Sequence, residues 1–136
     1  MSIVTTSGRK INILSLSYPA AVDLSDLQYC AVASSSAATG KMKVTTPGGQ
    51  GVLTVGILQS YNVDAANEQA EVLVEGCSKA IADSTFNSGV ELTASGADGK
   101  LEAASSGDYV IAISEEASTE ADQQVTVRVV SPYQKN

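Results

Sequence analysis

The sequence predicts an all-β protein, a single β-sandwich or barrel-like domain of roughly 8–10 strands with an extended N-terminal arm. Three observations predict this fold. Apolar and polar residues alternate with a period of two in several segments, turn residues recur at a spacing of roughly 8–12 positions, and no segment keeps a helical spacing of apolar residues. The length of 136 residues suits one domain.

The first ten residues are the predicted arm, and residues 11–136 are the predicted β domain. The arm is rich in Ser and Thr, ends on the cations Arg9 and Lys10, and has too little apolar character to pack in a core. Ile3 and Val4 could still add a short strand to the exposed edge of another subunit. We therefore expect the arm to reach onto a neighbouring chain.

Alternation is clearest in two segments of the predicted domain. Ala70, Val72 and Val74 share one face of the segment 70–75, and three valines repeat the pattern in 123–130. Similar reasoning predicts eight further strands at 11–18, 28–33, 41–46, 52–59, 77–82, 90–94, 100–104 and 109–114.

Turn signals separate the predicted strands. Asp98-Gly99 lies between two short strands and is a strong hairpin signal, and 87–89 and 105–108 are further turns. The segments 114–123 and 63–70 are the best candidates for helix. We expect them to be loops with at most one helical turn each.

A glycine-rich stretch, "TTPGGQGVLTVGILQS" at 45–60, invites a functional interpretation. A phosphate-binding loop would need Lys-Ser/Thr after its last glycine and a following helix, and Gly51 is followed by neither. Gly48-Gly49-Gln50 matches the tripeptide of peptide release factors, but such a protein must bind RNA and this chain is acidic. The stretch is interpreted as a turn that leads into a strand at 52–58.

Composition and charge point toward assembly with other chains. The chain has no Trp and one Phe, so its core consists of small side chains that bury little apolar area each. The net charge of −7 makes binding to nucleic acid through phosphate neutralisation a poor hypothesis. Residues 1–63 hold four cations and two acids, a net charge of +2, whereas residues 64–136 hold four cations and thirteen acids, a net charge of −9. The two parts are expected to face different surroundings.

No catalytic, cofactor-binding or metal-binding residues are predicted. The chain has no His, and nothing places Lys41 or Lys79 beside a particular serine as a base. The acids of the segment 114–123 lie in one polar loop, where they are expected to face water. A calcium site built from Asp64, Asn67 and Glu68 is conceivable, although their spacing is not that of an EF-hand.

Cys30 and Cys77 are interpreted as unpaired, buried thiols of a protein made in a reducing cytoplasm. The segment 8–23 has a basic start and a short apolar run, but polar residues interrupt the run, which favours a strand over a signal peptide. No run approaches the roughly 20 apolar residues of a membrane span. We expect a soluble protein without a membrane partner.

The second half of the chain resembles the head-decoration, or capsid cement, proteins of tailed double-stranded DNA phages. The resemblance covers residues 55–130 and rests on an ordered series of weak motifs rather than on one strong motif. The series departs from the family pattern at Asp108-Tyr109, where that family often has a second glycine. Its members here are Val55-Gly56-Ile57-Leu58, then Val72, Val74, Gly76 and Lys79, then Gly89, Asp98-Gly99-Lys100 and Ala103-Ala104, and finally Tyr109–Ile113 and Val125–Val129.

The resemblance implies a non-enzymatic virion protein that binds the outer surface of a phage head and links subunits of the major capsid protein. It also implies self-association, for which we expect a trimer rather than a dimer. The expected interface with capsid or neighbour combines apolar, polar and basic residues, and consists of Ile3, Val4, Thr5, Arg9, Lys10, Lys41 and Lys43.

The alternative hypothesis is a carbohydrate-binding β-sandwich of a phage or cell-surface structure. Exposed aromatic side chains in a groove would favour it, and five scattered tyrosines are available, namely Tyr18, Tyr29, Tyr61, Tyr109 and Tyr133.

Overall fold

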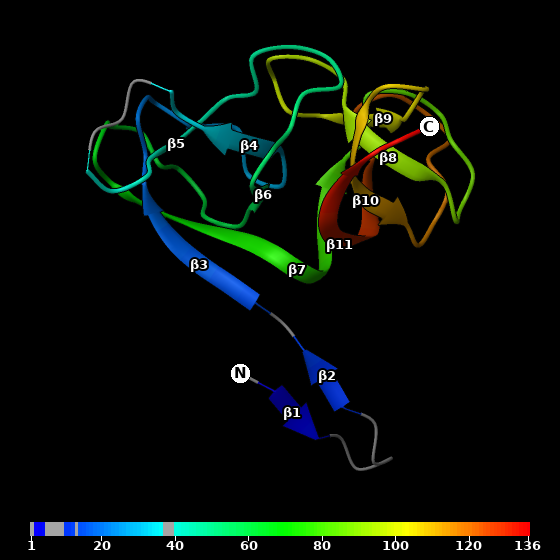
Figure 1. Ribbon diagram of the computed structural model, residues 1–136, viewed down its shortest axis with the longest axis horizontal. Helices are drawn as coiled ribbons and strands as arrows, with labels where there is room; N and C mark the ends of the chain where they lie inside the picture. Colours follow the sequence, from blue (N-terminus) through cyan, green and yellow to red (C-terminus); the bar gives the residue numbers. More distant parts are fainter. Residues whose placement is uncertain (1, 5–9, 13, 37–39) are drawn as a thin grey trace.

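The protein is all-β, as the alternation predicts. The computed structural model describes residues 2–4, 10–12, 14–36 and 40–136, and this part of the chain contains eleven strands and no helix (Figure 1). The strands are β1 (Ser2–Val4), β2 (Lys10–Asn12), β3 (Leu14–Pro19), β4 (Ala31–Ser34), β5 (Val44–Thr45), β6 (Gly56–Leu58), β7 (Gln69–Ile81), β8 (Glu91–Ala94), β9 (Leu101–Ala103), β10 (Tyr109–Ser114) and β11 (Gln124–Gln134).

One long strand, β7, connects the two halves of the main sheet. The strand order is β5-β4-β6-β7-β11-β10-β8-β9, and β3 also pairs with β7. Of the 13 residues of β7, those up to Glu75 pair with β3, and those from Gly76 onward pair with β11. Gly76 has φ of +121°, a conformation that residues with a Cβ avoid. This glycine therefore lets the strand bend between its two sets of partners.

The first half of the sheet curls around its own core. An isolated bridge between Ala20, which follows β3, and Val44 of β5 connects the two ends of this half. The pairings of β3, β7, β6, β4 and β5 complete the circuit. The buried side chains inside it are Ala20, Leu24, Val32, Val44, Leu58, Val63, Ala70 and Val72.

The second half repeats this arrangement on the other part of β7. Ala82, directly after β7, forms a bridge to Leu101 of β9, so that β7, β11, β10, β8 and β9 also curl back on themselves. The larger hydrophobic cluster fills this half. It includes Leu73, Ala80, Phe86, Leu92, Leu101, Ile111, Val125, Val127 and Val129.

Two glycine turns hold the halves together. The backbone C=O of Gly99, in the β8–β9 turn, accepts a hydrogen bond of 2.7 Å from the N–H of Ala31. Gly99 has φ of +75°, and a Cβ there would lie 2.3 Å from the backbone oxygen of Ala31. The hairpin predicted at Asp98-Gly99 is confirmed, and its tip lies directly on the first half.

The glycine-rich stretch supplies the second connection. The N–H of Gly51 donates to the C=O of Ala94, and its own C=O accepts from the N–H of Tyr109, both at 2.9 Å. The side-chain amide of Gln50 donates to the carboxylates of Glu102 and Asp108, also at 2.9 Å. The stretch is a turn, as predicted, and it ties the loop before β6 to the second half.

Several predicted strands differ from the observed ones. The segments 70–75 and 77–82 form one strand, because the bend at Gly76 does not interrupt the pairing. The segment predicted to begin a strand at residue 52 enters β6 only at Gly56, although the N–H of Val55 already donates to the C=O of Val32 in β4. The segment predicted as a strand at 41–46 contributes only Val44–Thr45. The segments 63–70 and 114–123 contain no helical turn, which agrees with the prediction of at most one in each.

The N-terminal residues form a hairpin where the sequence predicts an extended arm. Ile3 of β1 lies opposite Ile11 of β2 in an antiparallel pair, separate from the nine-stranded sheet. Figure 1 shows this hairpin beyond the start of β3, away from the main sheet. The predicted boundary after residue 10 and the strand predicted at 11–18 both begin inside the hairpin.

The bend at Gly76 generates the first prediction. Gly76→Ala should lower the free energy of unfolding by about 1–3 kcal/mol, because the new Cβ is forced into a positive-φ conformation. Gly96→Ala is the matched control, since a Cβ at Gly96 would have no atom within 4 Å. Urea unfolding monitored by circular dichroism measures both. Equal stabilities of the two variants would contradict the role of Gly76.

The cysteines generate the second prediction. Both are free, but only Cys30 is buried, whereas Cys77 is exposed on β7, so the expectation of two buried thiols is wrong for Cys77. Burial raises the pKa of the Cys30 thiol to about 11, and Asp98 adds to the rise. A thiol reagent at neutral pH should label one cysteine in the native protein and a second only after denaturation. Rapid labelling of both native cysteines would contradict this assignment.

Candidate interaction surface

The outer edge of β3 is open. Within the described part of the chain, β3 pairs with β7 and with no other strand. Its sequence, LSLSYP, carries no charge. Leu14 and Leu16 are 41% and 39% exposed, which is high for leucines in a strand. The β3–β7 register shifts between Leu14 and Ser15, and Pro19 ends the strand, so both ends of β3 carry features that protect an edge. The segment between them, residues 15–18, is the part of the edge that can accept a further strand.

The hydrogen-bonding groups available at this edge follow from the pairing of β7. The C=O of Glu71 accepts from the N–H of Gln59, on the β6 side of β7. Neighbouring residues of a strand bond toward opposite edges, so Val72 faces β3, where it pairs with Leu16. By the same alternation in β3, the N–H and C=O of Ser17 point outward.

Strands β3 and β11 pair with successive parts of one edge of β7, and a notch lies between them at Glu75 and Gly76. The N–H of Ile81 donates to the C=O of Tyr29 on the edge of β7 that also faces β6. Strand β11 pairs with the same part of β7, so it lies on the other edge, the edge that β3 also occupies. After Val129, which pairs with Gly76, the edge of β11 that faced β7 has no partner strand among the described residues. A shallow pocket of about 230 Å³ lies there.

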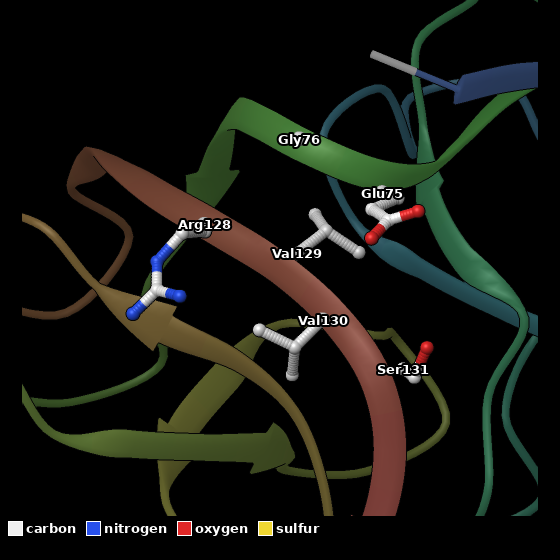
Figure 2. Close-up of a pocket in the computed structure, with 6 residues that line it drawn as sticks. All are labelled: Glu75, Gly76, Arg128, Val129, Val130 and Ser131. Atoms are coloured by element: carbon white, nitrogen blue, oxygen red, sulfur yellow. The ribbon is translucent and has the colours of Figure 1, made fainter. Parts of the chain in front are cut away.

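Figure 2 shows the side chains around the notch, which combine apolar and charged groups. Val129 and Val130 come from β11 together with Ser131, and Glu75 and Gly76 come from the bend of β7. The guanidinium of Arg128 forms an ion pair of 3.3 Å with Glu115. Glu75 takes part in no ion pair with another described residue, so it offers a negative charge beside the open edge.

A second acid on this side of the sheet is already engaged. The hydroxyl of Ser15 donates to the carboxylate of Glu71 at 2.6 Å. This contact ties β3 to β7 on the face that also carries Glu75. The surface therefore has an uncharged edge strand backed by two carboxylates.

The far end of β11 is held by a cluster around Glu91. The hydroxyl of Tyr133 donates to Glu91 at 2.5 Å, and the ammonium of Lys135 lies 3.3 Å from the same carboxylate. These contacts, Tyr133 first, lower the pKa of Glu91 below its ordinary value. The hydrogen bond to Glu91 also raises the pKa of Tyr133.

The interface residues predicted from the sequence fall at two places in the structure. Ile3 and Val4 lie in β1, and Lys10 begins β2. Lys41 is exposed and Lys43 is half-buried in the loop before β5. The remaining two, Thr5 and Arg9, lie outside the described residues.

The sequence reasoning missed the open edge of β3 and the notch. The uncharged Leu/Ser alternation of residues 14–17 is the signal that could have indicated an unprotected edge. No comparable signal exists for the notch, because it forms where β3 and β11 both pair with β7, and these pairings join residues that are far apart in the sequence.

The described residues offer little for metal or membrane binding. No group of three or more acids and cysteines in this part of the chain is arranged to hold a metal ion. A hydrogen bond with Asp64 raises the pKa of Glu68, so these two residues of the conceivable calcium site contact each other. No helix among the described residues is long and apolar enough to cross a membrane.

The tyrosines do not gather into one platform. Tyr18 packs against the core of the first half, and Tyr29 packs against that of the second half. Tyr61 is 79% exposed, and the hydroxyl of Tyr133 donates a hydrogen bond to Glu91. An aromatic groove of the kind that binds sugars is not formed by these side chains.

Comparison with known proteins identifies a structural neighbour. No protein-family model and no curated protein sequence matches the chain. Among solved structures, the N base of the head fiber protein gp8.5 of bacteriophage phi29 is similar, with a TM-score of 0.66. The match covers 88% of this chain and 95% of that chain at 17% sequence identity. The two proteins therefore share a fold over almost their full lengths.

The Glu91 cluster generates a pH prediction. Because its pKa is lowered in the folded protein, Glu91 contributes stability above its unfolded pKa, and this contribution is lost as the pH falls through the folded pKa. Tyr133→Phe should raise the pKa of Glu91 toward its ordinary value and make acid destabilisation less steep. NMR titration of the Glu91 carboxyl measures the shift. With exposed Tyr61→Phe as the control, an unchanged titration in Tyr133→Phe would refute the assignment.

Proposed function

We propose that this chain is a structural protein of a phage virion that binds the outer surface of the head and stabilises the shell by linking subunits of the major capsid protein. In this role it is not an enzyme and needs no cofactor. It acts as an oligomer, with a trimer expected, and it is made in the host cytoplasm before it joins the particle.

The observation that carries the proposal is the shared fold with the phi29 head fiber base over almost the whole of both chains. An independent indication comes from the sequence, because residues 55–130 resemble capsid cement proteins in an ordered series. Both comparisons lead to proteins of the phage head, although one rests on backbone geometry and the other on residue patterns.

Three glycines of that series have structural roles in this chain. A Cβ at Gly56 would lie 2.3 Å from the backbone oxygen of Leu73, so β6 can approach β7 only with glycine there. Gly76 provides the bend of β7, and Gly99 the contact with Ala31. These glycines thus serve the fold, and the capsid-binding surface is sought among exposed residues.

Charge supports a capsid-facing role for the N-terminal hairpin and the loop before β5. Both lie in the part of the chain with a net charge of +2, and both carry lysines, Lys10 in β2 and Lys41 and Lys43 in the loop. A chain with −9 in its remaining part would be repelled by an acidic shell unless such a basic surface faced it. We therefore propose these two basic segments as the contact with the capsid.

Binding to purified capsids that lack the protein tests this proposal. The full chain should co-sediment with capsids and raise the temperature at which they disrupt. Lys41→Glu/Lys43→Glu should weaken binding roughly 10-fold or more, because it places like charges against the shell. Lys79→Glu/Arg128→Glu, which changes the net charge equally on β7 and β11, should bind as the unmodified protein does.

The outcome separates this function from carbohydrate binding. If the protein does not co-sediment with capsids but binds defined oligosaccharides on an array, the cement function is wrong and the sugar-binding hypothesis is right. Equal binding by both charge-reversed variants would show that the basic loop is not the contact.

A further inference from the structure

Two elements of the structure are each left without a partner in a single chain. The hairpin of β1 and β2 pairs with no strand of the main sheet, and the outer edge of β3 pairs with no described strand. A two-stranded hairpin alone is at best marginally stable in water, and these strands have only three residues each. The hairpin therefore needs a surface to join.

The chain connectivity prevents the hairpin from joining its own β3. Strand β2 ends at Asn12 and β3 begins at Leu14, so a single residue separates them. Antiparallel strands need a connection of about two residues or more to reverse direction. Hence β2 cannot fold back beside β3 in the same chain, and only another chain can bring a hairpin to that edge.

The geometry points to the N-terminal hairpin of a second copy of this protein as the strand that completes the open edge of β3. The inference rests on the proposed function, in which the protein acts as an oligomer, and it names the contact that forms the oligomer. The incoming strand would hydrogen-bond to the outward N–H and C=O groups of Ser15 and Ser17.

Side chains and charge favour this occupant. The edge itself is uncharged, so a strand can approach a protein of net charge −7 without direct repulsion at β3. Glu75 lies at the notch beside the start of β3 and has no ion pair among described residues, whereas the hairpin carries Lys10. The sequence of the hairpin includes Ile3 and Ile11, and β3 offers the half-exposed Leu14 and Leu16 for apolar contact. A second β3 would offer neither the cation nor the isoleucines.

Three variants test the pairing through the oligomeric state. Deletion of residues 1–12 removes the donor hairpin and leaves the acceptor edge. Ser17→Pro removes an outward N–H from the edge but no hydrogen bond to β7, because Ser17 points away from β7. Ser17→Ala keeps the backbone N–H and is the control. Near-ultraviolet circular dichroism checks that each variant is folded.

Sedimentation velocity over a range of concentrations provides the readout. The unmodified protein and Ser17→Ala should be oligomers, and the deletion and Ser17→Pro should each sediment as monomers. A mixture of the two monomeric variants should form a one-to-one complex, because one retains the hairpin and the other the edge. If Ser17→Pro fails to fold, Leu16→Lys, which places a charge on the half-exposed edge face, takes its place.

Several results would overturn the inference. They are a monomeric unmodified protein, a deletion variant that remains oligomeric, and a mixture that forms no complex. Capsid co-sedimentation of the same variants keeps the two proposals apart. Persistent capsid binding by a protein that fails the pairing test would overturn only the pairing, whereas a hairpin-dependent oligomer that ignores capsids would overturn only the capsid function.

Discussion

The fold depends on a single strand that serves two cores. Ala70 and Val72 of β7 pack in the first core, whereas Leu73 and Ala80 of the same strand pack in the second. A straight strand of 13 residues could not follow both curled halves. The positive φ of Gly76 resolves this conflict, because it changes the direction of the strand while hydrogen bonding continues on both sides.

Close backbone approach compensates for the small side chains of the two cores. Alanine and valine dominate both clusters, and the glycines at positions 56 and 99 allow neighbouring backbones to meet where a Cβ would collide with a backbone oxygen. The hydrogen bonds of Gly51 and Gly99 then join one half to the other.

The sequence predicts the strand content well and the connections between strands poorly. Alternation in 70–75 and 123–130 correctly predicts β7 and β11, and Asp98-Gly99 correctly predicts the β8–β9 hairpin. Alternation could not reveal that 70–75 and 77–82 are one strand, since a glycine in a strand pattern signals either a bend or an end. Nor could it reveal the bridges that close each half, because Ala20 and Val44 are distant in sequence. The candidate surface escaped prediction for the same reason, since an edge is defined by the partners that a strand lacks.

The short separation of β2 and β3 in the sequence determines how the molecule responds to a mechanical load. With a single residue between the two strands, a pull on the N-terminal hairpin is directed along the length of β3. Strand β3 is antiparallel to β7 over six residues, and such a pull loads their hydrogen bonds in shear, all at once, rather than one after another as in unzipping. Shear is the stronger loading geometry for a β ribbon. A tether at the hairpin would therefore transmit tension into β7, the strand that both cores share.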